Sequence, residues 1–555
     1  MNACRAALAL AALLAIWNLW GYDLWAPDEP YFAEGAREMV VDGHWAVPHV
    51  NGAISTDKPP LFFWLIALFS LPLGHVTSLT ARLPSALAAL GSVALTCRLG
   101  RRLAGPRTGA LAALILATTY LAWDKSRSAQ IDALLCFLIL AALSAFEAYR
   151  SGQADGRRAG LLFWFAIALA VLAKGPVGLV LPLGIALVCL TVDRRLGALS
   201  RFAPVSGPLL FLAIVGLWAV AATVSGGGEY SLWGALKKHA LERALHGMHH
   251  VQPFWYYAKV IPVQMLPWSG LLPGAFVLAW RRRAAAAERF LLVYALFVVL
   301  FFTLSTEKRD LYVLPAYPAF ALLAAGLLAA AAGWDGMSLQ TAPGRTMSRR
   351  WVALPLSLTG FVLVAAGAAV PLAAARLERP LLGPALALGL ALAAGGAATA
   401  LAGRRCHYSD TLLASRIDVP ALCAAGAASA GYLVAATCLF PALNARLSAR
   451  PFALQVKEAT AASRTAGEDV LALGLSNLPE AVAFYSDGMY LRQTSNPADL
   501  AAHLRREARV YALTDADRLA ALPADIRERL FIVRAAEVGR RKVLLVSNRP
   551  GPPAP

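Results

Sequence analysis

Charged residues are scarce in this sequence. Only 15% of its 555 residues are Asp, Glu, Lys or Arg, whereas soluble domains carry roughly 25%. Hydrophobic residues make up 58% of the chain. This composition argues against a soluble multidomain enzyme and predicts many membrane spans.

Several familiar motifs are also absent. The 7 cysteines show no CxxC spacing, so we predict no structural disulfide and no cysteine-based metal site. Neither GxxxxGK[ST] nor GxGxxG after a predicted strand is found, and HExxH spacing is missing as well. These absences argue against a nucleotide-binding enzyme and against a zinc protease.

The net charge of +18 does not indicate nucleic-acid binding, because the arginines fall in short clusters between apolar runs. By the positive-inside rule these clusters are cytoplasmic. The clusters are Arg98, Arg101, Arg102 and Arg107; Arg150, Arg157 and Arg158; Arg194, Arg195 and Arg201; Arg281, Arg282, Arg283 and Arg289; Arg345, Arg349 and Arg350; and Arg404, Arg405 and Arg416.

The apolar runs predict an all-α polytopic membrane protein with about 13 spans, the N-terminus inside and the C-terminus outside. The first run is interpreted as an uncleaved helix. The run at 59–74 is short and flanked by proline, so we expect it to lie at the interface. The predicted spans are residues 6–20, 83–99, 109–123, 131–149, 160–173, 177–192, 209–224, 258–280, 290–304, 311–332, 351–374, 381–401 and 419–440.

The composition changes near residue 444. We therefore predict a membrane domain over 1–443, with outer loops at 21–80 and 225–258, and a small soluble α/β domain over 444–555. The strand-like segments DVLALGL, RVYALT and KVLLVSN alternate there with helical patterns. Asn496 before Pro497 suits a helix cap followed by the first helical residue. A lid or docking role without chemistry is favoured for this domain.

With this topology, the unusual polar groups gather on the extracytoplasmic face. They are Asp28, Glu29, Asp57, Lys58, Asp132, Lys174, Lys308 and Tyr312. Cations can neutralise a leaving phosphate, and a carboxylate can orient or deprotonate an acceptor. This pattern favours transfer of a group from a lipid-phosphate donor, with Asp28 as the leading catalytic candidate. We expect Asp132 and Lys174 to pair with Asp28 or with phosphate.

Plainer interpretations remain open for each of these residues. An acid at a helix end is common at a membrane interface, and an interfacial lysine can simply snorkel. In the long loop, His239 and Arg243 share a helical face, and Arg243 can clamp a phosphate. His239, His249 and His250 offer ligands for a divalent metal, although the residue pattern does not require any cofactor.

The segments WAPDEPYFAEGAREMVVDGHWAVPHVNG, DKPPLFFWLIAL and ARLPSAL resemble bacterial members of the dolichyl-phosphate-mannose protein mannosyltransferase superfamily. The later segments AKGPVGL, HALERALHGMHHVQPFWYY, LPWSGLLPGA and STEKRDLYVLPAYP are similar to the same group, in the same order. Within the superfamily, the chain most resembles the lipid A aminoarabinose transferases. The resemblance covers roughly residues 1–332 well and the rest only in architecture.

The resemblance implies a GT-C glycosyltransferase of the bacterial inner membrane, with its active site on the periplasmic face. It implies a donor sugar, 4-amino-4-deoxy-L-arabinose, carried on undecaprenyl phosphate, and a lipid A phosphate as acceptor. Asp28 matches the catalytic acid of the first loop, and Asp132 matches a second acid. Lys58 and Arg243 match positions that bind the donor phosphate.

Three alternatives remain open. The first is a transferase of the same superfamily that modifies a protein or a surface polysaccharide. The second is a transporter or flippase, which would place its charges near the midplane between internal repeats. The third is a non-catalytic scaffold. A labelled lipid-linked sugar separates them, because an enzyme transfers the sugar, a transporter moves it without transfer, and a scaffold does neither.

Overall fold

The computed structural model describes residues 2–227, 251–342, 345–377, 379–408, 418–465, 470–475, 478–539 and 541–550. Contacts between Cα atoms divide the chain into two compact units. The first, called here the helical unit, comprises Met1–Leu19, Asp57–Leu61 and Arg82–Leu439. The second, the mixed unit, comprises Trp20–Thr56, Phe62–Ala81 and Phe440–Pro555.

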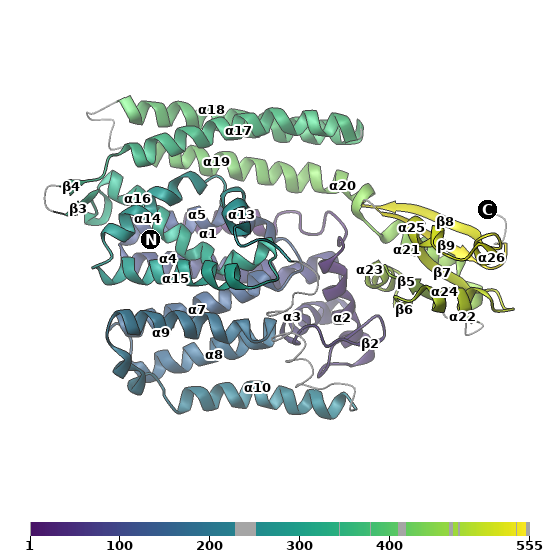
Figure 1. Ribbon diagram of the computed structural model, residues 1–555. Helices are drawn as coiled ribbons and strands as arrows, with labels where there is room; N and C mark the ends of the chain where they lie inside the picture. Colours follow the sequence, from purple (N-terminus) through teal and green to yellow (C-terminus); the bar gives the residue numbers. More distant parts are fainter. Residues whose placement is uncertain are drawn as a thin grey trace. The chain divides into compact units, whose positions relative to one another are not determined.

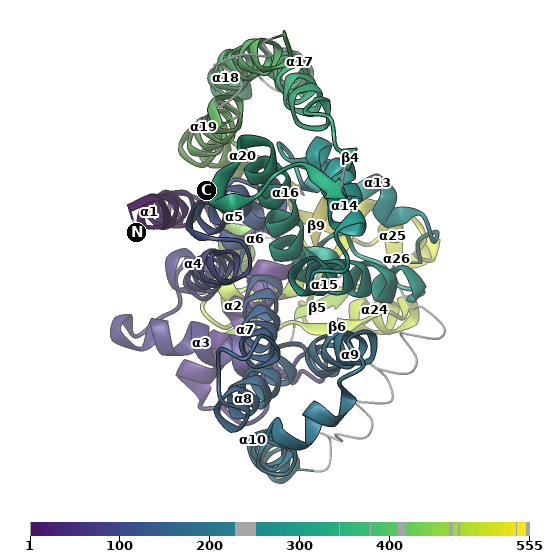
Figure 2. The ribbon, with the colours of Figure 1, turned by 90° about the vertical axis from the view of Figure 1, so that its left-hand side faces the viewer.

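Long apolar helices build the helical unit, and they share one general direction (Figure 1), so that Figure 2 shows many of them end-on. The α-helices are α1 (Asn2–Ile16), α4 (Ser78–Leu103), α5 (Pro106–Ala117), α6 (Tyr120–Ser126), α7 (Asp132–Arg150), α8 (Gly156–Lys174), α9 (Val177–Val192), α10 (Ser206–Ser225), α13 (Tyr256–Gln264), α14 (Leu272–Arg281), α15 (Ala286–Leu304), α16 (Tyr317–Ala332), α17 (Arg350–Leu377), α18 (Leu382–Tyr408) and α19 (Asp418–Val434). Short 3-10 turns connect them at η2 (Leu196–Arg201), η4 (Ser269–Leu271), η5 (Asp310–Ala316), η6 (Trp334–Gly336) and η7 (Arg379–Leu381). A π-turn, η9 (Ala435–Leu439), follows α19, and β3 (Gln340–Ala342) pairs with β4 (Arg345–Thr346).

In the described residues, nine helices are long and apolar enough to cross a membrane, and four apolar helices are shorter. The chain is therefore a multi-pass membrane protein, as predicted, while the count of 13 spans stays a prediction. In an apolar stretch of 18 residues within Asp310–Ala332, 94% of the residues are buried within the protein, whereas only 17% are buried in the corresponding stretch of α10. The exposed leucines and valines of α10 are suited to face the bilayer, because the core of the bilayer is apolar.

Three sequence predictions differ from the structure here. The predicted span at 109–123 is divided at Thr118 and Thr119 into α5 and α6. The run at 258–280 is not one helix, because prolines and glycines divide it into α13, η4 and α14. Cys4 and Cys97 form a disulfide, which corrects the prediction that none exists. Their Cα atoms lie 6.5 Å apart across α1 and α4, within the range that a disulfide spans. A separation of 93 residues gave no pattern from which to predict this pair.

The mixed unit combines the first loop with the C-terminal part of the chain. The loop contributes α2 (Asp28–Asp42), the hairpin of β1 (His49–Val50) and β2 (Ala53–Ile54), α3 (Leu61–Ser70) and η1 (Leu71–Leu73). At roughly 1.5 Å per residue, the 10 residues of α3 are too short to cross a bilayer, in line with the interfacial placement predicted for 59–74.

The C-terminal part, called here the tail (residues 440–550), is an α/β domain, as predicted. It contains α20 (Phe440–Leu447), α21 (Arg450–Ala459), α22 (Ala461–Thr465), β5 (Val470–Leu473), α23 (Leu478–Tyr485), β6 (Arg492–Thr494), α24 (Pro497–Leu504), β7 (Tyr511–Asp515), α25 (Ala516–Ala520), α26 (Ala524–Arg527), β8 (Phe531–Val538) and β9 (Arg541–Ser547). Its sheet has the order β6-β5-β7-β9-β8, with β5 parallel to β6 and β7 and the other pairs antiparallel.

Alternation along the strands explains why helices cover both faces of this sheet. Val470 and Ala472 pack into one apolar core with α21 and α23, while Leu471 and Leu473 pack into another with α24. The Asn496 side chain accepts a hydrogen bond from the Ala498 backbone N–H at 3.0 Å. The predicted helix cap is therefore confirmed.

Candidate active site

The polar end of the helical unit is built first of all by α7 and α8, which pack against each other. Asp132 is the first residue of α7 and Lys174 is the last residue of α8, so the two side chains meet at one end of the helix pair. Lys174 Nζ lies 2.5 Å from Asp132 Oδ1, and these side chains are only 15% and 8% exposed. The helix dipoles favour both charges, because an acid begins one helix and a cation ends the other.

Tyr312 in η5 covers the same lysine. The Lys174 ammonium lies 4.6 Å from the centroid of the Tyr312 ring, within the range of a cation–π contact. The structure thus brings together three residues predicted at the outer face, namely Asp132, Lys174 and Tyr312. Asp132 and Lys174 pair with each other, whereas the sequence led us to expect pairing with Asp28 or phosphate.

A second ion pair lies beside them on α6. Lys125 Nζ is 2.8 Å from Asp124 Oδ2. Burial alone would lower the pKa of Lys125, but the hydrogen-bonded Asp124 and the charges of Asp132 and Asp310 outweigh it and raise this pKa above its ordinary value. Two ammonium groups and three carboxylates therefore influence one another in one region. We call Asp124, Lys125, Asp132, Lys174, Asp310 and Tyr312 the polar cluster.

The segment from Ser305 to Asp310 is fixed by hydrogen bonds from its own lysine and from α13. Lys308 Nζ donates to the carbonyl oxygens of Ser305 and Gln252, at 2.5 and 3.1 Å. Burial lowers the pKa of Lys308. Two side chains of α13 also donate to this segment, since Tyr257 Oη bonds to the Arg309 carbonyl and Gln264 Nε2 to the Asp310 carbonyl. Lys308 thus shapes the backbone beside the polar cluster.

Asp57 and Lys58 also belong to the helical unit, just before α3, where Lys58 Nζ donates to the Asp57 carbonyl oxygen at 3.2 Å. Asp28 and Glu29 belong to the mixed unit as the first two residues of α2. Glu29 is buried, and its Oε2 accepts a hydrogen bond from the Trp25 backbone N–H at 2.9 Å. Glu29 therefore fixes the chain entering α2, while Asp28 is only partly buried.

The remaining candidates, His239, Arg243, His249 and His250, lie outside the described residues. Within the described ranges, the structure has no group of three or more His, Cys, Asp or Glu side chains placed to hold a metal ion. The predicted phosphate contact of Arg243 and the histidine metal site stay predictions.

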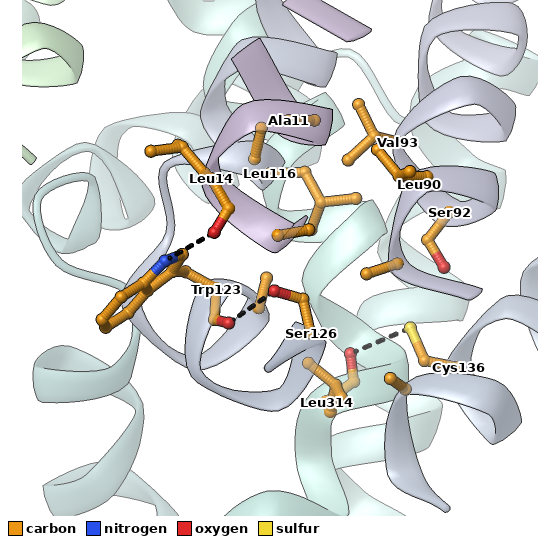
Figure 3. Close-up of a pocket in the computed structure, with 15 residues that line it drawn as sticks. Ala11, Leu14, Leu90, Ser92, Val93, Leu116, Trp123, Ser126, Cys136 and Leu314 are labelled. Atoms are coloured by element: carbon orange, nitrogen blue, oxygen red, sulfur yellow. Dashed lines mark hydrogen bonds between the residues drawn. The ribbon is translucent and has the colours of Figure 1, made fainter. Parts of the chain in front are cut away.

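An apolar cavity of about 40 Å³ lies beside the polar cluster, between α1, α4, α5, α6 and α7 (Figure 3). Its few polar atoms are bound to backbone carbonyls: Ser126 Oγ donates to Trp123 and Cys136 Sγ to Leu314. A cavity of this size and lining stays dry and offers nothing to a sugar hydroxyl. The polar cluster is therefore the better candidate for chemistry in this unit.

Three residues of the cluster, Asp124, Lys125 and Asp310, had no role assigned from the sequence, and Lys125 is the cation among them. It stands in WDKSRSAQID, a short polar stretch between two apolar runs, where any of several charges could face the site. That Lys125 and Asp132 influence each other follows from the packing of α6 against α7, which the sequence does not show.

Part of the chain is similar in sequence to known glycosyl transferases. Residues 57–220 match the family described as dolichyl-phosphate-mannose-protein mannosyltransferase. The chain is 31% identical over 335 residues to the undecaprenyl phosphate-alpha-4-amino-4-deoxy-L-arabinose arabinosyl transferase of Edwardsiella ictaluri, covering 60% of each chain. It is 32% identical over 327 residues to the protein of the same name from Pseudomonas aeruginosa (strain LESB58), covering 58% of each. The matched region thus spans less than two thirds of these relatives.

The fold also resembles solved structures. The crystal structure of ArnT from Cupriavidus metallidurans bound to undecaprenyl phosphate matches with a TM-score of 0.76 and 19% identity, covering 98% of both chains. An oligosaccharyltransferase from Archaeoglobus fulgidus matches with a TM-score of 0.52 and 12% identity, covering 96% of this chain and 72% of that one. Over residues 57–220 this chain is thus similar in sequence to the dolichyl-phosphate-mannose-protein mannosyltransferase family, and over nearly its whole length its fold is similar to that of ArnT.

Proposed function

We propose that this protein is a membrane glycosyltransferase that moves 4-amino-4-deoxy-L-arabinose from undecaprenyl phosphate to a phosphate of lipid A. The names of the relatives support this donor. The observation that carries the proposal is the polar cluster, in which the Asp132–Lys174 pair is buried at one end of an apolar helix bundle. Buried charges at the end of a membrane helix are costly unless they are paired and used.

We place the reaction on the periplasmic face of the bacterial inner membrane. The arginine-rich end of the helical unit supports this orientation, because Arg150 and Arg289 lie at the ends of α7 and α15 opposite to the polar cluster. The 19 residues of α7 separate the two ends by about 28 Å, which is close to the thickness of the hydrocarbon layer. The positive-inside rule then makes the cluster extracytoplasmic.

The proposed reaction is a single displacement with inversion. An acceptor oxygen forms a bond to the anomeric carbon while the bond from that carbon to the donor phosphate breaks, so that undecaprenyl phosphate leaves with the bonding electron pair. Asp28 takes the acceptor proton, or orients an acceptor phosphate that is already ionised. Lys58 and Arg243 stabilise the charge on the departing phosphate. Asp132, ion-paired with Lys174, is the second acidic residue of the proposed site.

Mass spectrometry of lipid A tests this proposal in cells with and without the chain. The expected result is loss of an aminopentose in the deletion strain, with restoration by the wild type and not by Asp28→Asn. Asp155→Asn is the matched control, because Asp155 caps α8 and asparagine caps a helix equally well. Unchanged lipid A in the deletion strain refutes the acceptor, and full activity of purified Asp28→Asn refutes the role of Asp28.

A second candidate is transfer of a polyprenyl-phosphate-linked sugar to a protein or a surface polysaccharide. The match of residues 57–220 to a family described by protein mannosyl transfer favours it. Unchanged lipid A combined with the loss of a sugar from a glycoprotein or polysaccharide would identify this acceptor instead.

A further inference from the structure

The tip of the β1–β2 hairpin is bound to the tail by the side chain of Asn51. Asn51 and Gly52 both have positive φ angles, 58° and 74°, as an Asn-Gly hairpin turn requires. Asn51 Nδ2 donates to the Leu491 carbonyl oxygen at 2.6 Å, and Asn51 Oδ1 accepts from the Leu491 N–H at 2.8 Å. Asn51 is buried, so this amide pairs with the tail backbone as a neighbouring strand would.

The C-terminal half of α2 meets the same part of the tail. Tyr490 Oη donates to Asp42 Oδ2 at 2.6 Å and accepts from Arg37 Nη2 at 3.2 Å. Two glycines make this approach possible. A Cβ atom on Gly52 would lie 2.9 Å from the Tyr490 ring, and one on Gly488 would lie 2.9 Å from the Arg37 guanidinium. The surfaces of loop and tail are therefore fitted closely to each other.

The chain entering α2 is held by the tail as well. Asp23 accepts hydrogen bonds from Asn444 Nδ2 at 3.0 Å and from Ser448 Oγ at 2.7 Å. The Tyr485 hydroxyl binds both backbone groups of Leu24, accepting from its N–H at 2.6 Å and donating to its carbonyl oxygen at 3.2 Å. The chain four and five residues before Asp28 is thus held by α23 and by α20 with the Ser448 that follows it.

We propose that the tail is a positioning element for α2, and that Asn51 and Tyr485 are positioning residues that set where Asp28 presents its carboxylate. This inference rests on the proposed function for its catalytic consequence. It gives the tail a task in the reaction, although the tail contributes no reacting group of its own.

The helix α2 requires such support because it is short. An isolated helix of 15 residues is marginal in water, so α2 depends on tertiary contacts for its stability and direction. Phe32 packs against the Phe62 and Phe63 rings of α3, which holds one part of the helix. The hydrogen bonds to the tail secure the two ends. Because a displacement of about 1 Å can cost roughly a hundredfold in rate, loosening these ends reaches the proposed chemistry.

Hydrogen exchange combined with steady-state kinetics on the full-length protein tests this inference. We expect Asn51→Ala to speed amide exchange across α2 relative to wild type, while exchange in β5 and β7 is unchanged. We expect kcat for sugar transfer to fall roughly tenfold to a hundredfold, with KM within about threefold. Tyr485→Phe keeps the ring and removes the hydroxyl that bonds to Leu24, so it should act in the same direction.

The matched control is Asn548→Ala, because Asn548 also binds three backbone groups, all of them within the tail. It should leave α2 exchange and kcat unchanged. The inference is overturned if both loop variants exchange like the wild type in α2, or if Asn548→Ala lowers kcat as much as they do. If the wild type transfers no aminoarabinose, the proposed function fails, and the exchange results alone still decide whether the tail positions α2.

Discussion

Removal of the Lys174 ammonium is the sharpest perturbation of the polar cluster. Lys174→Met keeps a long apolar stem but leaves the Asp132 carboxylate, only 8% exposed, without its partner at 2.5 Å. Two opposite charges about 4 Å apart attract each other by about 4 kcal/mol at an effective dielectric constant of 20. Breaking one side of a buried pair costs about 3–5 kcal/mol. We therefore expect Lys174→Met to lower the free energy of unfolding by that amount.

A double-mutant cycle separates stability from chemistry at this pair. Asp132→Asn combined with Lys174→Met removes both charges, so it should recover most of the stability that Lys174→Met loses. The purified double variant should nevertheless transfer no sugar, because the proposed second acid is gone. Thermal unfolding in detergent measures the first effect and the lipid A assay the second. Additive losses of stability in the cycle, or an active double variant, would refute the reasoning.

Three further predictions follow from other contacts. Burial and a neighbouring glutamate raise the pKa of Glu38 from 4.5 to about 8. The free energy of unfolding should therefore fall as the pH rises from about 4.5 to 8. Urea unfolding at a series of pH values should show a flatter dependence for Glu38→Gln. Arg150 is buried and bonds to two carboxylates, so Arg150→Met should lower the unfolding free energy by about 3–5 kcal/mol, and the more exposed Arg289→Met should lower it by less. A Cβ atom on Gly178 would lie 2.4 Å from the backbone of α8, whereas one on Gly216 would meet no other atom within 4 Å. Thermal unfolding should therefore show a loss of about 1–3 kcal/mol in unfolding free energy for Gly178→Ala and no loss for Gly216→Ala.

The sequence was most informative where a physical rule links composition directly to position. The arginine clusters placed Asp132 and Lys174 at one end of the bundle, and the structure brings these two side chains into contact. Hydrophobic runs predicted the membrane helices, because a segment that crosses lipid must be helical and apolar almost regardless of which helices it packs against. The cap at Asn496 was predictable because capping is a local interaction.

The sequence could not predict which residues far apart in the chain contact each other. Nothing local in the sequence indicates that Cys4 meets Cys97, or that Asn51 binds Leu491. The Asn-Gly pair at 51–52 is a strong hairpin signal that could have been used, but its partner in the tail could not have been found from it. Lys125 was missed for the same reason, since its effect depends on which helices surround it.

The union of the first loop with the tail has a consequence for biosynthesis. More than 380 residues separate Thr56 from Phe440, and these two residues lie in the same compact unit. At about 5–20 residues per second, translation of that interval takes on the order of 20–80 s, during which α2 has left the ribosome without its partner. The loop must therefore wait in an incomplete state, with Glu34 and Glu38 solvated, until the last segment emerges. A nonsense mutation late in the reading frame would thus disable a helix that was made at the very beginning.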